Sequence, residues 1–136
     1  MKNNKGFSLV ELIIVIAIMA ILVGVMAPQL IKYIEKTNVS SDVQLCDSIR
    51  TALTTACMDP DVVRAGGDLS DGTGKSLPSG DSVAKAAEDI LGVSLSAVGS
   101  QLKSKSAKGK AIVYTKSGNQ IKVYVSGLES TIYSGN

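Results

Sequence analysis

The chain has 136 residues and contains no histidine, no tryptophan, one phenylalanine and two cysteines. Without histidine it cannot form a Ser-His-Asp or Cys-His catalytic arrangement, and two cysteines are too few for a zinc site built from four Cys or His ligands. No serine lies in a nucleophile elbow, and no glycine-rich loop has the pattern that cradles phosphate. The sequence therefore predicts no catalytic residues, no metal site and no cofactor.

The chain does contain one long uncharged segment near its N-terminus. Lys2 and Lys5 precede an apolar stretch that opens at Phe7, and residues 12–30 carry no charged side chain. These nineteen residues would form a helix about 28 Å long, close to the ~30 Å hydrocarbon core of a bilayer. The segment is therefore long enough to span a membrane.

Glu11 is the unusual residue of this segment, because it lies five residues into the apolar run. A carboxylate in a membrane helix costs roughly 2.5–3.5 kcal/mol on insertion scales and calls for a partner. The helix offers no obvious basic partner, so we expect one from another molecule. A plain membrane anchor, or a secretory signal peptide cut after Val25-Met26-Ala27, explains the apolar length but not Glu11.

The stretch from Lys5 to Ile18, KGFSLVELIIVIAI, resembles the N-terminal signature of type IV pilins. The resemblance implies that a prepilin peptidase cuts between Gly6 and Phe7, and that the new amine of Phe7 is methylated. It also implies that Glu11 pairs with the Phe7 amine of a neighbouring subunit during assembly. Such a pair would set the axial register, because a misplaced subunit leaves a buried charge unpaired.

Gly24 and Pro28 form a predicted point of helix distortion. Proline has no amide hydrogen, so the carbonyl of Gly24 loses its helical hydrogen bond. In the family that the signature resembles, helices often lose regularity near this position.

Beyond Pro28 the apolar pattern becomes one-sided and predicts an amphipathic helix that ends at Asp59-Pro60. Asp42 and Asp47 fall on its polar side. Cys46 and Cys57 would lie about 16 Å apart along this helix, too far for a disulfide, so we expect free core thiols. The expected apolar positions are Ile31, Ile34, Val39, Val43, Cys46, Ile49, Leu53 and Ala56.

Residues 60–110 are predicted to be rich in loops, with one or two short helices. One helix should run from an N-cap at Asp81 or Ser82 to Leu91 and end at Gly92, and residues 93–102 could add another short helix or turn. Strands are expected at 111–115 and 120–125, joined by a turn at 117–119, with a third strand from Leu128 to Tyr133.

The predicted fold class is α+β, with a long N-terminal helix packed on a small antiparallel sheet. The expected parts are a leader at residues 1–6, a membrane or filament-core helix at 7–30, its amphipathic half at 31–59 and a head at 60–136.

Basic residues cluster late in the chain, where six lysines precede the next acid, Glu129. They form either a solvated loop or a surface that complements acidic residues of the next subunit. Nucleic acid is not excluded as a partner, although no interleaved aromatic residues support sequence readout. These lysines are Lys103, Lys105, Lys108, Lys110, Lys116 and Lys122.

The resemblance implies a structural subunit of a type IV pilus, inserted in the cytoplasmic membrane as a precursor and surrounded there by lipid. After cleavage and methylation, the pilus assembly machinery would polymerise it into an extracellular, helical homo-oligomer that serves adhesion, motility, biofilm formation or DNA uptake. The small size and simple head favour a major pilin, and the lack of a cysteine after Cys57 favours a Gram-positive or anaerobic source. The alternatives are a minor pilin, a type II secretion pseudopilin and, more remotely, a membrane-anchored enzyme.

Overall fold

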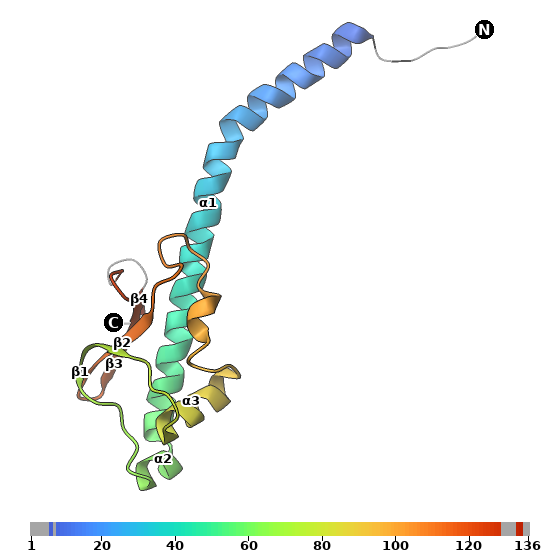
Figure 1. The fold of residues 1–136 in the computed structure, drawn as a ribbon. Helices are drawn as coiled ribbons and strands as arrows, with labels where there is room; N and C mark the ends of the chain where they lie inside the picture. The colour runs from blue at the N-terminus through green and yellow to red at the C-terminus, as the bar shows by residue number, and fades with distance from the viewer. Residues whose placement is uncertain (1–5, 7, 129–132, 135–136) are drawn as a thin grey trace. The chain divides into compact units, whose positions relative to one another are not determined.

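The computed structural model describes residue 6, residues 8–128 and residues 133–134. The chain divides into two units, Met1–Ile34 and Glu35–Asn136, called here the N-terminal and the C-terminal unit. The elements, in chain order, are α1 (Leu9–Met58), α2 (Pro60–Arg64), β1 (Gly72–Ser76), α3 (Ser82–Leu91), the 3₁₀ helix η1 (Val98–Gln101), β2 (Ile112–Ser117), β3 (Gln120–Val125) and β4 (Tyr133–Ser134) (Figure 1).

Local signals fix both ends of α1. At its start, the Oγ atom of Ser8 accepts a hydrogen bond of 3.2 Å from the backbone N–H of Glu11. Ser-x-x-Glu is the capping-box pattern, which satisfies amide groups that have no partner in the first turn. At its end, Asp59 caps α2 by accepting a bond of 2.8 Å from Asp61 N–H, and Pro60 takes the first position of α2. The predicted end of the long helix at Asp59-Pro60 is confirmed.

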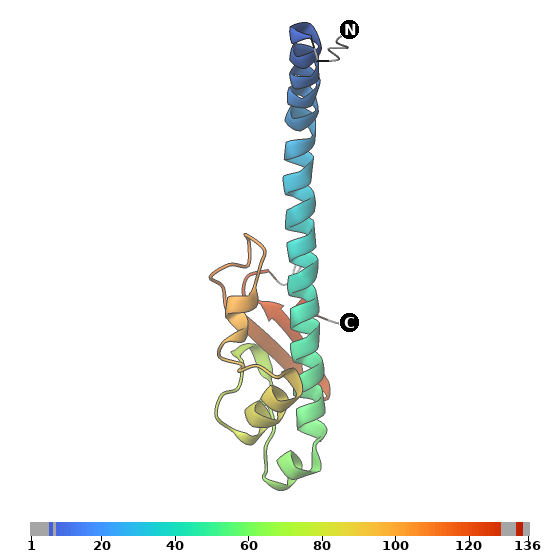
Figure 2. The same cartoon turned by 90° about the vertical axis from the view of Figure 1, so that its right-hand side faces the viewer.

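The core of the C-terminal unit lies between α1, the sheet and the segment that holds α3 and η1 (Figures 1 and 2). From α1, the fully buried apolar side chains are Cys46, Ile49, Ala52, Leu53 and Ala56. Burying a side chain such as Ile49 or Leu53 contributes roughly 1.5–3 kcal/mol. Ile31 and Ile34, which the pattern placed on the same apolar face, are instead 57% and 53% exposed.

The sheet has four strands in the order β1-β2-β3-β4, and every neighbouring pair is antiparallel. β2 and β3 form the predicted hairpin, in which Ile112 pairs with Val125 and Ser117 with Gln120. Gly118 opens the two-residue turn with a φ of +60°, a conformation that favours glycine. The predicted α+β fold, a long helix on a small antiparallel sheet, is confirmed.

β1 differs from the sequence prediction, which placed residues 72–76 in a loop. Lys75 pairs with Tyr114 and Ser76 with Val113 on β2, whereas the register shifts between Gly72 and Lys75. Gly72 and Gly74 have φ values of +147° and +64°. Pairing with β2 therefore makes a strand of a segment whose own residues favour turns.

The helix α3 follows its predicted signals, whereas the predicted third strand is met only at its end among the described residues. Asp81 caps α3 by accepting a bond of 2.7 Å from Ala84 N–H, and Gly92 ends it with a φ of +74°. Of the predicted third strand, residues 129–132 lie outside the described residues, Leu128 is not in a strand, and Tyr133–Ser134 pairs with β3.

Candidate assembly site

The N-terminal unit exposes a continuous apolar helix surface. From Ser8 to Ile34 no residue is buried, and large side chains such as Leu9, Ile16 and Ile21 are more than half exposed. By length and composition, α1 contains a segment that can cross a membrane. Soluble monomers rarely expose apolar surfaces of this extent, so lipid or other protein is expected to cover it.

Gly6 is the only described residue of the expected cleavage pair. It is exposed, and a Cβ atom added there would meet nothing within 4 Å. The fold of the chain therefore does not require glycine at this position. Phe7, the predicted site of cleavage and methylation, lies outside the described residues.

Glu11 lies in the first turn of α1 and is exposed. The ion pairs found among the described residues do not include Glu11. A carboxylate at this position is favoured by the helix dipole, so Glu11 has a local role besides any role in assembly. Its predicted partner, the Phe7 amine of another subunit, belongs to a second chain.

Gly24 and Pro28 both lie within α1, and the helix continues through them. A Cβ atom on Gly24 would meet nothing within 4 Å, so packing within the chain does not require glycine there. The distortion predicted at these residues stays a prediction.

The C-terminal unit contains a carboxylate site that the sequence pattern missed. Asp42 is fully buried, and its two oxygens accept bonds of 2.8 and 2.9 Å from the backbone N–H groups of Lys103 and Ser104. Glu35, two turns earlier on α1, accepts a bond of 2.9 Å from Lys105 N–H. Two acids of α1 therefore bind three successive amide groups of the segment after η1.

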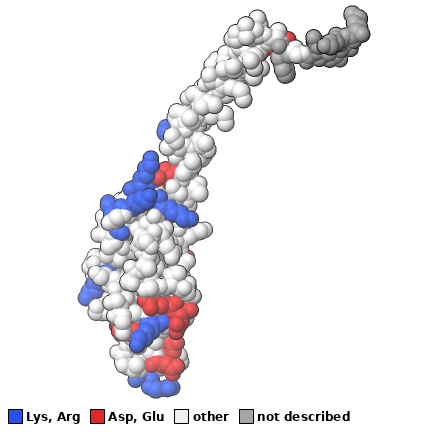
Figure 3. Space-filling model, turned by 45° about the vertical axis from the view of Figure 1, so that its right-hand side comes forward, with Lys and Arg blue, Asp and Glu red and all other residues white. Residues whose placement is uncertain are grey.

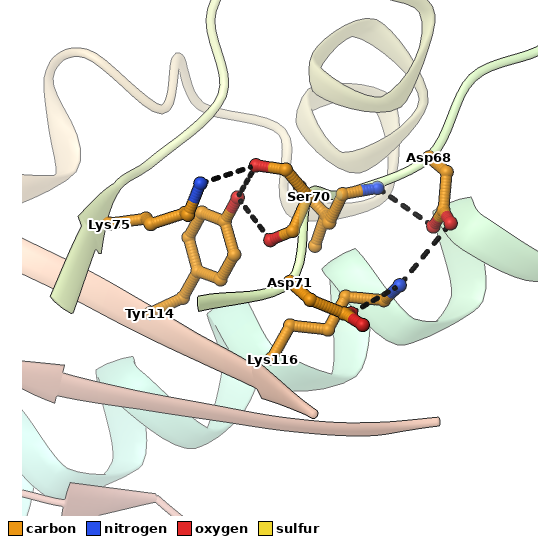
Figure 4. Close-up of polar contacts among 7 residues, drawn as sticks. Asp68, Ser70, Asp71, Lys75, Tyr114 and Lys116 are labelled. Atoms are coloured by element: carbon orange, nitrogen blue, oxygen red, sulfur yellow. Dashed lines mark hydrogen bonds and ion pairs between the residues drawn. The ribbon is translucent and has the colours of Figure 1, made fainter. Parts of the chain in front are cut away.

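A second polar cluster joins the loop before β1 to strand β2 (Figure 4). Lys116 Nζ lies 3.2 Å from Asp68 and 3.3 Å from Asp71, and its side chain is only 12% exposed. Burial would lower the pKa of Lys116, but its hydrogen bonds to Asp68 and Asp71 outweigh this and raise it. Lys116 is thus an internal residue of the unit, not part of a solvated lysine surface.

The same cluster includes two hydroxyl groups. The Tyr114 hydroxyl donates to the carbonyl oxygen of Ser70 at 3.4 Å, and Lys75 Nζ donates to Ser70 Oγ at 3.0 Å (Figure 4). Three residues of the loop thus contact side chains of β1 and β2. This arrangement fixes the loop against the sheet.

Both cysteines are free thiols, as the helix spacing predicted. Burial, followed by the nearby Asp42 carboxylate, raises the pKa of the Cys46 thiol to about 12. Burial also raises the pKa of Cys57, which is half-buried beside a groove of about 510 Å³ lined in part by Met58 and Lys116. Within the described part of the chain, no three His, Cys, Asp or Glu side chains come together as a possible metal site.

Part of this chain is similar to known proteins. Residues 1–27 match the family model described as prokaryotic N-terminal methylation motif. A fimbrial protein of Moraxella nonliquefaciens is 42% identical over 55 residues, which cover 40% of this chain and 36% of the relative. A fimbrial protein of Pseudomonas aeruginosa is 39% identical over 59 residues, covering 43% and 38% of the two chains.

A type IV major fimbrial protein FimA of Dichelobacter nodosus is 39% identical over 78 residues, which cover 57% of this chain and 49% of the relative. The chain thus spans between 36% and 49% of the length of these three relatives. No solved structure matches the chain. These relatives give no support to the expected Gram-positive source. In its methylation motif, its long apolar helix and its α+β fold, the chain is similar to type IV pilins.

Proposed function

We propose that this protein is a structural subunit of a type IV pilus. The observation that carries the proposal is the uncovered apolar helix from Leu9 to Ile34, whose first part lies within the match to the methylation motif. In the precursor, lipid of the cytoplasmic membrane covers this surface. In the extracellular filament, the same surface of other subunits covers it.

The proposed processing follows from the same segment. A prepilin peptidase removes residues 1–6 by cutting between Gly6 and Phe7, and the new amine of Phe7 is methylated. A residue without a side chain lets the peptidase approach the scissile bond closely. The open space around Gly6 supports this, because the fold itself gives no reason for glycine there.

The proposed parts of the mature chain are a membrane or filament-core helix at 7–30, its amphipathic half at 31–59 and a head at 60–136. Gly24 and Pro28 give the first part a weak point at which the helix can distort. The pilus assembly machinery adds subunits to a growing helical homo-oligomer. Glu11 pairs with the Phe7 amine of a neighbouring subunit, and this pair sets the axial register of the subunits.

We further propose that the protein is a major subunit. The relatives from Dichelobacter nodosus are named as major fimbrial proteins, and the C-terminal unit is a small head with a simple sheet. The relatives from Moraxella nonliquefaciens and Pseudomonas aeruginosa are named as fimbrial proteins, which argues against a membrane-anchored enzyme. A minor pilin or a secretion pseudopilin is the alternative, and it would be found only in traces in sheared filaments.

Electron microscopy of filaments sheared from cells, with mass spectrometry of their main subunit, tests the proposal. We expect this chain as the main subunit, with methylated Phe7 as its first residue. Gly6→Val should leave an uncut precursor in the membrane, whereas Gly6→Ala should still be cut in part because its side chain is a single methyl group. A mature N-terminus at Pro28 or beyond would identify an ordinary secreted protein instead.

A further inference from the structure

The segment from Lys103 to Lys110, called here the lysine loop, has a fixed backbone. Asp42 and Glu35 bind its first three amide groups, as described above. Within the loop, Lys108 N–H donates to Ser104 O and Lys110 N–H to Ala107 O, both at 3.0 Å. Ala107 is fully buried, so the loop is also anchored in the core.

The four lysine side chains of this loop are all exposed. None of these four lysines forms an ion pair with another described residue, whereas Lys116 pairs with Asp68 and Asp71. The two carboxylates beneath the loop are bonded to backbone amide groups. The loop therefore holds several unpaired positive charges on a fixed backbone, which lowers the backbone entropy lost on binding.

A surface of opposite charge lies on α2 and α3, which pack against each other in the same unit. Two of its acids are used locally, because Asp59 accepts from Asp61 N–H and Glu88 from Leu95 N–H. Asp61 pairs with Arg64, but both side chains are highly exposed, so the pair contributes little. The members of this acidic surface are Asp59, Asp61, Glu88 and Asp89, with Arg64 and Lys85 as the nearby bases.

Figure 3 shows basic side chains gathered above on one face of the C-terminal unit and most of the acidic ones below, where basic atoms also lie among and beneath them. The unit thus has a basic surface, the lysine loop, and a separate acidic surface on α2 and α3 that could bind it in another copy. Contacts of this head-to-tail type do not close on themselves unless the rotation allows a ring, so they build helical filaments. Complementary charges steer association and exclude wrong registers.

We propose that the lysine loop of one subunit docks on the acidic surface of α2 and α3 of another copy. This inference rests on the proposed function, which requires copies of the chain to meet in a filament. A second copy is favoured over nucleic acid because residues 101–111 contain no aromatic side chain on which bases could stack. The acidic surface that the loop requires is also present on the chain itself.

Charge reversal in the full-length chain tests the docking. Lys108→Glu with Lys110→Glu leaves the amide groups bound by Asp42 and Glu35 in place, and should reduce sheared filaments about tenfold or more. Lys108→Arg with Lys110→Arg is the matched control and should assemble normally. Asp61→Lys with Asp89→Lys should show the same loss, and combining both reversals should restore filaments to within about threefold of wild type.

A second measurement does not depend on variants. Filaments grown from a mixture of isotopically light and heavy subunits are treated with a carbodiimide, which joins amines directly to carboxylates. We expect light-to-heavy cross-links between lysine-loop peptides and peptides of α2 or α3. Links from the loop only to other acidic segments would overturn the proposal.

The remaining outcomes are also decisive. Filaments of normal amount from the Lys108→Glu, Lys110→Glu variant would overturn the docking. If those filaments have also lost retention of duplex DNA that wild-type filaments bind, the loop is a polyanion site instead. A wild-type chain that enters no filament would overturn the proposed function itself, and this result is seen before any variant is made.

Discussion

The carboxylate of Asp42 accepts a hydrogen bond of 2.9 Å from the backbone N–H of Ser104, 62 residues later in the chain. Both residues are fully buried. The contact ties the middle of α1 to the segment after η1 at a point where neither group can exchange its partner for water. Asp42 is therefore a structural residue, although its charge and its spacing on α1 suggested a solvated one.

The C-terminal unit is expected to fold without residues 1–34. The hydrophobic core cluster lies between Val39 and Leu128, and every described residue that the deletion removes is exposed. A fragment of residues 35–136 should be soluble and monomeric and should unfold cooperatively in urea. Circular dichroism and analytical ultracentrifugation check this, and aggregation or a gradual loss of signal would show that the unit depends on the N-terminal helix.

Asp42→Ala is expected to lower the free energy of unfolding of this fragment by about 2–4 kcal/mol, because it leaves buried amide groups without an acceptor. Asp42→Asn should cost nearly as much, since its amide group places a donor against a donor. Urea titration measures both changes. Asp47→Ala is the matched control on the same helix: its pair with Arg50 is exposed, so the change should stay within about 0.5 kcal/mol. Equal effects at Asp42 and Asp47 would contradict the structural role of Asp42.

Lys116 is expected to stabilise the unit at neutral pH and to lose this effect in alkali. Its pKa is raised above 10.5 in the folded state, so the stabilisation is complete below the unfolded value and declines as the pH rises through the folded one. Lys116→Met should cost roughly 1 kcal/mol at pH 7 because Asp68 and Asp71 stay well solvated. The difference between wild type and variant, followed by urea titration, should shrink above about pH 10.5. A difference that grows with pH would contradict the assignment.

The two thiols are expected to react at different rates in the native fragment. Cys46 is fully buried with a pKa near 12, whereas Cys57 is half-buried beside a groove. Since the thiolate is the reactive form, Cys57 should be alkylated at least about tenfold faster at pH 8. Mass spectrometry after timed labelling measures both rates. Under denaturing, non-reducing conditions both residues should label, and a two-hydrogen mass deficit would instead reveal a disulfide.

Glu11→Val is expected to leave the precursor cut and inserted in the membrane but to abolish filaments in cells that lack the wild-type chain. Valine removes the cost of burying a carboxylate, so insertion should not suffer. Glu11→Gln should be intermediate, because an amide accepts a hydrogen bond but supplies no charge. Electron microscopy and immunoblots of sheared fractions measure the outcome.

Ser8→Ala is the control for the local role of Glu11. It removes the Oγ atom that accepts from Glu11 N–H and so weakens the start of α1, but it leaves the carboxylate in place. If Ser8→Ala reduces filaments as strongly as Glu11→Val, helix capping and not pairing between subunits explains Glu11.

The parts of the fold that sequence predicted are those fixed by neighbours in the chain. Asp59-Pro60 ends α1, Asp81 and Gly92 delimit α3, and Gly118 turns the hairpin, each through a local hydrogen bond or dihedral preference. The missed features depend on distant partners. β1 pairs as a strand with β2, about 40 residues later, and Asp42 binds amide groups that lie 61 and 62 residues later in the chain.

The candidate site divides in the same way. Gly6, Phe7 and Glu11 lie within one short motif, so the sequence predicts them together. The sequence also shows the run of lysines, but it does not distinguish the largely buried lysine from the exposed ones. In the sequence Lys116 looks like Lys108 and Lys110. Only the fold shows that Lys116 lies between two aspartates and that the other two face solvent.

The irregular strand β1 has a consequence for a protein that is concentrated in a polymer. β1 is an outer strand of the sheet, and an outer strand with regular geometry invites strands of neighbouring molecules to extend the sheet. The shift between Gly72 and Lys75, with its two glycines in unusual conformations, breaks the spacing of amide groups that an incoming strand would need. Strands of neighbouring copies therefore pair poorly with this edge, which disfavours amyloid-like aggregation through β1. Lateral contacts between copies at this edge are then made by side chains.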